Sequence, residues 1–175
     1  MADSNIDVGR EALLHALTDA DVAFVLIGGA ALQSHGQPHR TDDIDITPER
    51  STQNLDRLAR VLNALDCRLV IDPADPTGDV RLPSGYFTSA ALSRQDIWNL
   101  MTTDGKLDIT FQPAGFARGF DQLSERAEAR QVALTSITVK VAALDDVEHS
   151  KRTADRPKDR AYLARAGRLR PPRDA

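Results

Sequence analysis

Residues 25–47 constrain the fold more than any other stretch, and they read VLIGGAALQSHGQPHRTDDIDIT. An apolar run ends in Gly28 and Gly29, a helix-like AALQSH segment follows, and a second apolar segment contains Asp43 and Asp45. Because successive side chains of a β-strand point to opposite faces, the two aspartates share one face and the isoleucines beside them occupy the other. The stretch therefore predicts a strand, a glycine turn, a short helix and a second strand that carries two carboxylates on one side.

Asp43 and Asp45 have two interpretations. Alone, a D-x-D pair is most simply the solvent-exposed face of an edge strand, because like charges at this spacing repel each other and add little to packing. Residues 106–110 (KLDIT) repeat the alternation, however, with Asp108 on the polar face. Carboxylate oxygens on one side of a strand are suitable ligands for a hard divalent cation. Three such aspartates beside a glycine turn favour a metal site.

Gly28 and Gly29 also have a functional and a structural interpretation. Residues without a side chain let the backbone approach another chemical group closely. The helix that follows directs its unpaired N–H groups and the positive end of its dipole toward that group. This arrangement suits the triphosphate of a nucleotide, whereas the alternative is a tight strand–helix corner without a ligand.

A fourth motif lies near the end of the chain, where Lys151 is followed by RPKD at residues 156–159. The ordered set of a GG turn, a D-x-D strand, a later strand with one aspartate and a K…R-x-K-D segment resembles the nucleotidyltransferase superfamily of DNA polymerase β-like proteins. More narrowly, it is similar to the minimal bacterial nucleotidyltransferases related to AbiEii-type toxins. The resemblance spans residues 20–165, which is nearly the whole chain.

The resemblance implies an α+β (α/β) polymerase β-like nucleotidyltransferase fold. The order of the predicted strands and helices suits a mixed sheet with helices packed on one side. Length and composition suit one domain, which we place at residues 1–166. Its C-terminal helices, within residues 142–166, carry the K…RPKD motif. Residues 167–175 form a basic tail.

The same resemblance assigns the site residues. Asp43, Asp45 and Asp108 become ligands of two Mg²⁺ ions, with Mn²⁺ as an alternative, and Asp108 also helps to deprotonate the attacking hydroxyl. Gly28 and Gly29 hold the triphosphate of an NTP. Many relatives place a serine after the glycines, where this chain has alanines, so backbone amides serve instead.

The K…RPKD motif supplies the remaining catalytic candidates. Lys151 neutralises charge that develops on the phosphates, and Asp159 closes the site and orients Lys151. Lys140 is a rival of Lys151, but its alternating context is typical of an edge-strand lysine. Whether Arg156 or Lys158 also meets phosphate is left open.

Two residues before the D-x-D motif are further nucleotide-binding candidates. Arg40 can reach a phosphate or neutralise the aspartates, and Thr41 can contact the nucleotide or a metal-bound water. Surface roles are predicted for His35 and His39, because Mg²⁺ prefers oxygen ligands. Tyr162 takes the last acidic position of the family motif and is assigned a structural role.

The implied reaction transfers a nucleoside monophosphate from an NTP to an acceptor hydroxyl and releases pyrophosphate. AbiEii-like toxins modify the 3′ end of tRNA, so the expected function is a toxin-like enzyme of a toxin–antitoxin or phage-defence system, with an antitoxin protein as a partner. Transfer to a protein or a small molecule is an alternative. So is a non-catalytic binding partner that retains the fold.

The charge distribution and the cysteine content suggest a class of partner and a cellular location. Residues 151–175 carry a net charge of +6 and residues 1–150 a net charge of −10, which suggests an anionic partner such as nucleotide phosphates or RNA. The alternative is a solvated tail that aids solubility. A single cysteine, Cys67, fits a reducing compartment, and no apolar run is long enough to span a membrane. The expected location is the cytoplasm.

Periodicity and turn residues predict the other elements. Asp104-Gly105 indicates a hairpin, Ser51 caps a helix, and Trp98 and Cys67 are expected in the core. Residues 72–87 are expected to be a loop that either shapes the acceptor cleft or has no role. The expected helices are 7–19, the segment after Ser51, 117–129, 142–153 and 157–166; the expected strands are 22–27, 67–71, 97–102, 106–112 and one or two within 131–140.

Overall fold

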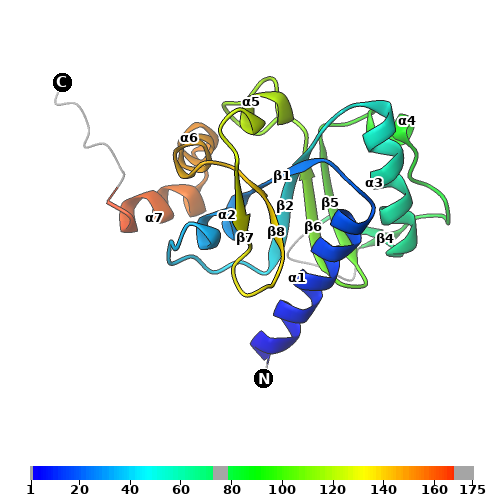
Figure 1. Ribbon diagram of the computed structural model, residues 1–175, viewed down its shortest axis with the longest axis horizontal. Coiled ribbons are helices and arrows are strands. Elements are labelled where there is room, and N and C mark those ends of the chain that lie inside the picture. The colour runs from blue at the N-terminus through cyan, green and yellow to red at the C-terminus, as the bar shows by residue number, and fades with distance from the viewer. Residues whose placement is uncertain (1, 73–78, 168–175) are drawn as a thin grey trace.

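The computed structural model of the protein describes residues 2–72 and 79–167. In this part of the chain, eight strands form one mixed sheet in the order β4-β3-β5-β6-β2-β1-β8-β7 (Figure 1). The strands are β1 Phe24–Ile27, β2 Asp43–Pro48, β3 Arg68–Leu69, β4 Val80–Arg81, β5 Ile97–Thr102, β6 Gly105–Thr110, β7 Glu128–Gln131 and β8 Thr138–Val141. The helices are α1 Ala2–Asp19, α2 Gly28–Ser34, α3 Thr52–Ala64, α4 Ser89–Leu92, α5 Phe120–Ser124, α6 Leu144–Ala154 and α7 Pro157–Arg165.

Strand β2 lies inside the sheet, antiparallel to β1 and parallel to β6. The pairing places Asp45 directly opposite Asp108 on one side and Ile27 on the other. The predicted hairpin is confirmed, because β5 and β6 pair antiparallel across Asp104 and Gly105. The strands with the aspartates are therefore neighbours although about sixty residues separate them.

Helices cover both faces of the sheet, so the expectation of helices on one side is wrong. Ile44 lines a cavity together with residues of α1, whereas Asp45, which points to the opposite face of β2, lines a cleft together with residues of α6. The apolar run of β1 explains the difference, because consecutive buried residues such as Val25 and Leu26 need a covering layer on each side. In Figure 1, α6 and α7 lie at the opposite end of the molecule from α3 and α4.

Several local predictions are confirmed. Trp98 and Cys67 are buried, and the Ser51 side chain caps α3 by accepting from the Asn54 N–H. Helices α6 and α7 are separated at the predicted break, where Asp155 adopts a left-handed conformation with φ of 49° and Pro157 begins α7.

Two segments differ from the prediction. Residues 117–129 form only the short helix α5, and the chain then enters β7, because the hydrogen bonds that β7 makes with β8 outweigh the helical pattern of its residues. The predicted loop 72–87 contains β4, which pairs with β3, while residues 73–78 of that loop lie outside the described residues. Strand β3 itself is shorter than the predicted strand 67–71.

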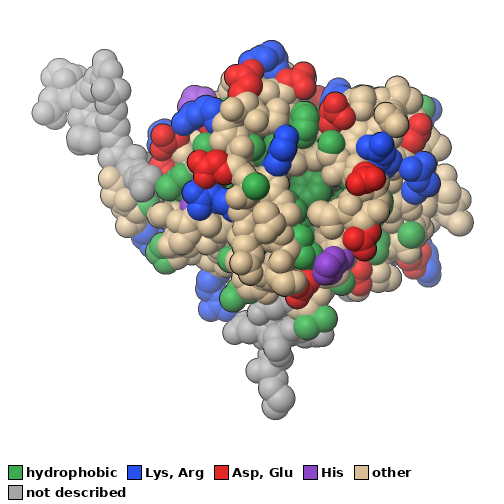
Figure 2. All heavy atoms as spheres, viewed as in Figure 1, with side chains coloured by type: hydrophobic (Ala, Val, Ile, Leu, Met, Phe, Trp, Pro, Cys, Tyr) green, Lys and Arg blue, Asp and Glu red, His purple; other side chains and the backbone are tan. Residues whose placement is uncertain are grey.

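The surface carries both signs of charge. Figure 2 shows basic and acidic side chains interspersed over the visible face rather than gathered by sign. Lys140, predicted on an edge strand, is exposed on β8, which lies between β1 and β7 and is not an edge. No described helix is both long and apolar enough to cross a membrane.

Candidate functional site

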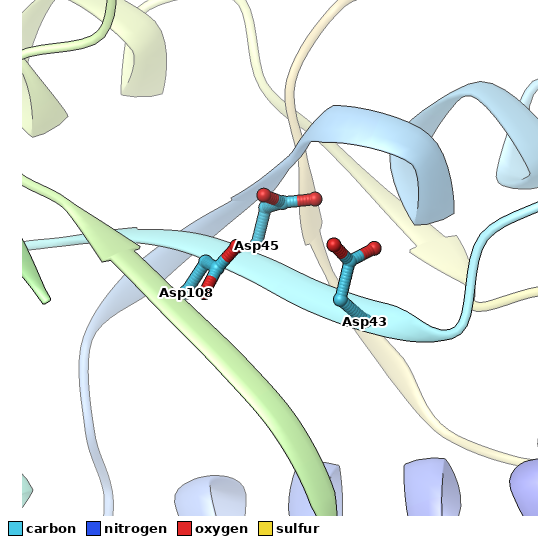
Figure 3. Close-up of side chains that lie close together, drawn as sticks. All are labelled: Asp43, Asp45 and Asp108. Carbon is cyan, nitrogen blue, oxygen red and sulfur yellow. The ribbon is translucent and has the colours of Figure 1, made fainter. Parts of the chain in front are cut away.

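Asp43, Asp45 and Asp108 come together on one face of the central strands. Each offers a carboxylate oxygen, and these three oxygens lie within 4.8 Å of one another. Figure 3 shows the side chains rising from β2 and β6 toward a common space. The alternation of β2 and its parallel pairing with β6 produce this arrangement, since Asp45 and Asp108 are register partners. The predicted clustering of the three aspartates is confirmed.

The cluster concentrates negative charge without a direct counter-ion. Burial, with the charges of Asp43 and Asp108, raises the pKa of Asp45 to about 7, and burial together with Asp43 raises the pKa of Asp108 to about 6. Among the described residues, no basic side chain forms an ion pair with any of the three. A divalent cation would remove the repulsion, and carboxylates are the ligands that Mg²⁺ and Mn²⁺ take. The donor set therefore fits a metal centre.

The glycine turn is fitted against Asp45. Gly28 adopts a left-handed conformation with φ of +65°, and a Cβ at this position would overlap the Oδ2 atom of Asp45. The N–H of Gly29 donates to the Asp45 carboxylate, and a Cβ there would lie 2.6 Å from the Cβ of Thr41. Both glycines are thus required by close approach. Their contact with a triphosphate stays a prediction.

Thr41 contacts the aspartate cluster, whereas no such contact is described for Arg40. The Thr41 hydroxyl donates to the Oδ1 atom of Asp43, so Thr41 touches the cluster through a metal-ligand candidate, although it lies before the start of β2. Arg40 is exposed, and within the described chain it forms no ion pair with the aspartates. Neutralisation of the cluster by Arg40 therefore stays a prediction. Its contact with a phosphate stays a prediction.

Lys151 and Asp159 meet across the break between α6 and α7. The Lys151 Nζ atom lies 3.1 Å from the Oδ1 atom of Asp159, whose side chain is fully buried. Arg156 donates to the other oxygen at 2.6 Å. Burial alone would raise the pKa of Asp159, but the bonds from Arg156 and Lys151 outweigh it and lower that pKa. The ion pair with Asp159 thus fixes the position of Lys151, while the role of the pair in catalysis stays a prediction.

His39 and Tyr162 complete this side of the site, and the sequence did not indicate their contact. The two rings meet edge to face, with centroids 5.6 Å apart, and the Lys151 Nζ lies 5.6 Å from the centre of the Tyr162 ring. Burial, followed by the charge of Lys151, lowers the pKa of His39. His39 is half-buried rather than a surface residue. An isolated histidine in a loop carries no pattern that would have indicated this contact.

Lys158 and Arg156, which the sequence left open, both lie near the site. The charge of Lys158 lowers the pKa of Asp45 and Asp108, which places it close to the aspartates, and its side chain is exposed. Arg156 lines the same cleft as Asp45 and Lys151.

A cleft of about 380 Å³ opens beside the aspartates. Asp45 and Lys151 lie on its wall, and the rest of its lining is largely apolar, with a few polar side chains among them. Such a volume and lining are typical of a small-molecule site. Most of the residues that complete it come from β6, the segment after β6, α5 and α6, and single residues come from β1, β5 and the segment before α6. No single sequence motif therefore contains them; they include Thr110, Gln112, Phe116, Leu123, Val147 and Ser150.

No protein-family model matches the sequence, and no curated protein matches it significantly. A function must therefore be inferred from the geometry of the site.

Proposed function

We propose that the protein is a metal-dependent nucleotidyltransferase of the DNA polymerase β-like superfamily, which transfers a nucleoside monophosphate from an NTP to a hydroxyl group. The observation that carries the proposal is the convergence of Asp43, Asp45 and Asp108 on adjacent strands. Three half-buried carboxylates, two of them with elevated pKa values, are costly to a fold that has no use for them. A non-catalytic binding module does not need three carboxylates that face one another.

Asp43, Asp45 and Asp108 would hold Mg²⁺, which supplies charge neutralisation of the phosphates and activation of the attacking hydroxyl. The chain's own groups then account for the remaining requirements. Lys151, fixed by Asp159, would place a positive charge on the wall of the same cleft that Asp45 lines, where it can stabilise negative charge that develops on the phosphates. Because Asp159 and its partners hold the ammonium group in advance, little reorganisation is needed during the reaction.

The cleft supplies the nucleotide site. Its volume of about 380 Å³ suits a nucleoside, and its apolar lining can cover the base. Gly28 lines it next to Asp45, so the triphosphate would lie where the cleft meets the metal ligands. Arg156 and Lys158 add positive charge at this end.

We propose the 3′ end of tRNA as the acceptor and a toxin-like role for the enzyme. Lys158, Tyr162 and Arg165 are spaced to share one face of α7, and the charges of Lys158 and Arg165 both act on His39. Lys158 and Arg165 are exposed, so they can offer positive charge to a phosphodiester backbone near the site.

The experiment that tests the proposal incubates the protein with Mg²⁺, each labelled NTP and total tRNA, and then separates RNA, protein and small molecules. Label in tRNA that is lost with EDTA and in Asp43→Asn supports it, because the amide keeps the shape of the side chain and removes the charge that holds the metal. Asp42→Asn, at an exposed neighbour paired with Lys106, is the matched control and keeps activity. Label in protein or in a small molecule contradicts tRNA as the acceptor and leaves nucleotidyl transfer standing. Equal NTP binding with and without Mg²⁺ in wild type and Asp43→Asn contradicts the whole proposal.

A further inference from the structure

Arg10 occupies a position in α1 that the helical pattern assigns to the core. It precedes Leu13, Leu14 and Leu17 by three, four and seven residues, so all four share one face of the helix. The leucines are fully buried, and Arg10 itself is only 4% exposed. A guanidinium group therefore lies at a buried helix position that an aliphatic side chain would ordinarily occupy.

The buried charge of Arg10 has no acidic partner among the side chains that the structure describes. Within the described residues it forms no ion pair, and its Nε atom is buried without a hydrogen-bond partner. Burial of a cation without a counter-ion is strongly unfavourable. Folding alone therefore does not explain an arginine at this position.

The two terminal nitrogens of Arg10 are directed at the segment that leads into β2. Nη2 donates to the Thr41 carbonyl at 2.6 Å, and Nη1 donates to the Gln33 side chain at 3.0 Å. Gln33 in turn donates to the His39 carbonyl at 2.7 Å. Residues 37–42 have no helix or strand of their own, so these side chains hold their backbone.

The end of this chain of contacts is a candidate metal ligand. The Thr41 hydroxyl donates to the Oδ1 atom of Asp43, and Asp43 is the first residue of β2. Asp43 pairs with Lys106 of β6 but, unlike Asp45, with no residue of β1. A shift of the Thr41 backbone would therefore move the hydroxyl that orients the Asp43 carboxylate. Asp45, which pairs with both β1 and β6, does not depend on this segment.

We propose that Arg10 and Gln33 are positioning residues that fix the segment 37–42 and thereby set Asp43 in the geometry that binds the metal. The inference rests on the proposed function, since it assumes that Asp43 is a ligand. It adds a role for α1, whose described side chains contribute neither to the aspartate cluster nor to the cleft.

The test replaces Arg10 with methionine, which has a similar unbranched stem but no donors, and measures Mn²⁺ binding through the loss of the free-ion electron paramagnetic resonance spectrum. We expect Arg10→Met to weaken Mn²⁺ binding about tenfold, as is usual when a group that orients a ligand is removed. In the metal-free protein, amide hydrogen exchange at residues 38–42 becomes faster while the central strands keep their protection. Arg57→Met, which removes a similar bond from an arginine to the Asp21 carbonyl, is the matched control and leaves Mn²⁺ affinity unchanged.

A double-mutant cycle with Asp43→Asn separates positioning from a general structural effect. If Arg10 acts through Asp43, Arg10→Met causes no further loss of Mn²⁺ affinity in the Asp43→Asn protein, whereas independent effects would add. Additive losses, or unchanged affinity in Arg10→Met, overturn the inference and leave the proposed function standing. A wild-type protein that does not bind Mn²⁺ overturns both. If Arg10→Met fails to fold, Gln33→Leu carries the same test, with an expected loss of about threefold because one of two holding side chains remains.

Discussion

Lys151 is a single side chain whose role can be separated from that of its surroundings. It is nearly buried, and Asp159 and the ring of Tyr162 fix its position. We expect Lys151→Ala to reduce nucleotide transfer about a hundredfold or more, the scale found when one preorganised charge is removed from a transition state. The protein should still fold, because Asp159 keeps its bond to Arg156. Transfer rates at saturating NTP, with circular dichroism as the folding check, measure both effects.

Lys140→Ala is the control for this prediction, since Lys140 is exposed on β8 and its replacement removes an equal charge. It should leave the rate near the wild-type value. Loss of transfer in Lys140→Ala but not in Lys151→Ala would mean that the motif has been assigned to the wrong element, with the aspartate cluster unaffected. If neither variant changes the rate, Arg40 becomes the next residue to replace.

The turn between β1 and α2 can be tested as an element. Gly28→Ala introduces a Cβ that overlaps the Asp45 carboxylate, and the left-handed backbone adds a further cost of about 1–2 kcal/mol. We expect reduced stability and weaker Mn²⁺ binding, measured by denaturant unfolding and by titration. Gly36→Ala measures the cost of the left-handed backbone alone, because Gly36 has φ of +73° but a Cβ added there would meet no atom within 4 Å. If Gly36→Ala weakens Mn²⁺ binding as much as Gly28→Ala does, contact with Asp45 is not the reason for the first glycine.

The elements that could be predicted are those with a local physical cause. The alternation around Asp43 and Asp45, the hairpin at Asp104-Gly105 and the break before Pro157 depend on neighbouring residues alone. Strand β7 could not be predicted, because its residues take strand geometry only through pairing with β8. The second layer of helices has no motif of its own, and its one signal is the unbroken apolar run of β1, which requires cover on each face.

The candidate site also contains residues that the sequence could predict and residues that it could not. A motif contained each residue of the aspartate cluster and the Lys151–Asp159 pair, so the sequence could predict them. His39 and Arg10 reach the site through contacts between distant segments. His39 has no spacing or neighbour that distinguishes it from an ordinary loop histidine. The helical spacing of Arg10 from buried leucines indicates burial, but not its contact with the segment before β2.

At the scale of the whole molecule, the aspartate cluster should make stability depend on pH. The pKa of Asp45 is about 7 in the folded chain, against an ordinary value of 3.8, because burial and the neighbouring aspartates disfavour its charge. Between these values the folded state binds more protons than the unfolded state, so the cluster's contribution to the free energy of unfolding falls as pH rises from about 4 to 7. Above pH 7 this contribution is constant.

Thermal unfolding in EDTA at pH 5, 6, 7 and 8 measures this dependence. We expect Asp45→Asn to raise Tm at pH 8 by about 2–5 °C, to have little effect at pH 5, and to abolish stabilisation by Mg²⁺. Asp42→Asn, at an exposed aspartate, should leave the profile unchanged. A wild-type profile that is parallel to that of Asp45→Asn would mean that Asp45 is not the group responsible.

The parallel pairing of β2 with β6, together with the contact between α6 and α7, has a consequence for the chain during its synthesis. The aspartate cluster is incomplete until residue 108 has been synthesised, because residues 43 and 45 supply only two of its three carboxylates. The side chain of residue 151 has no ion-pair partner until residue 159 has been synthesised. Pairing between segments so far apart is also slow compared with the closing of local turns. An incomplete nascent chain therefore lacks the assembled site, and any activity that depends on that site begins only when residue 159 has left the ribosome.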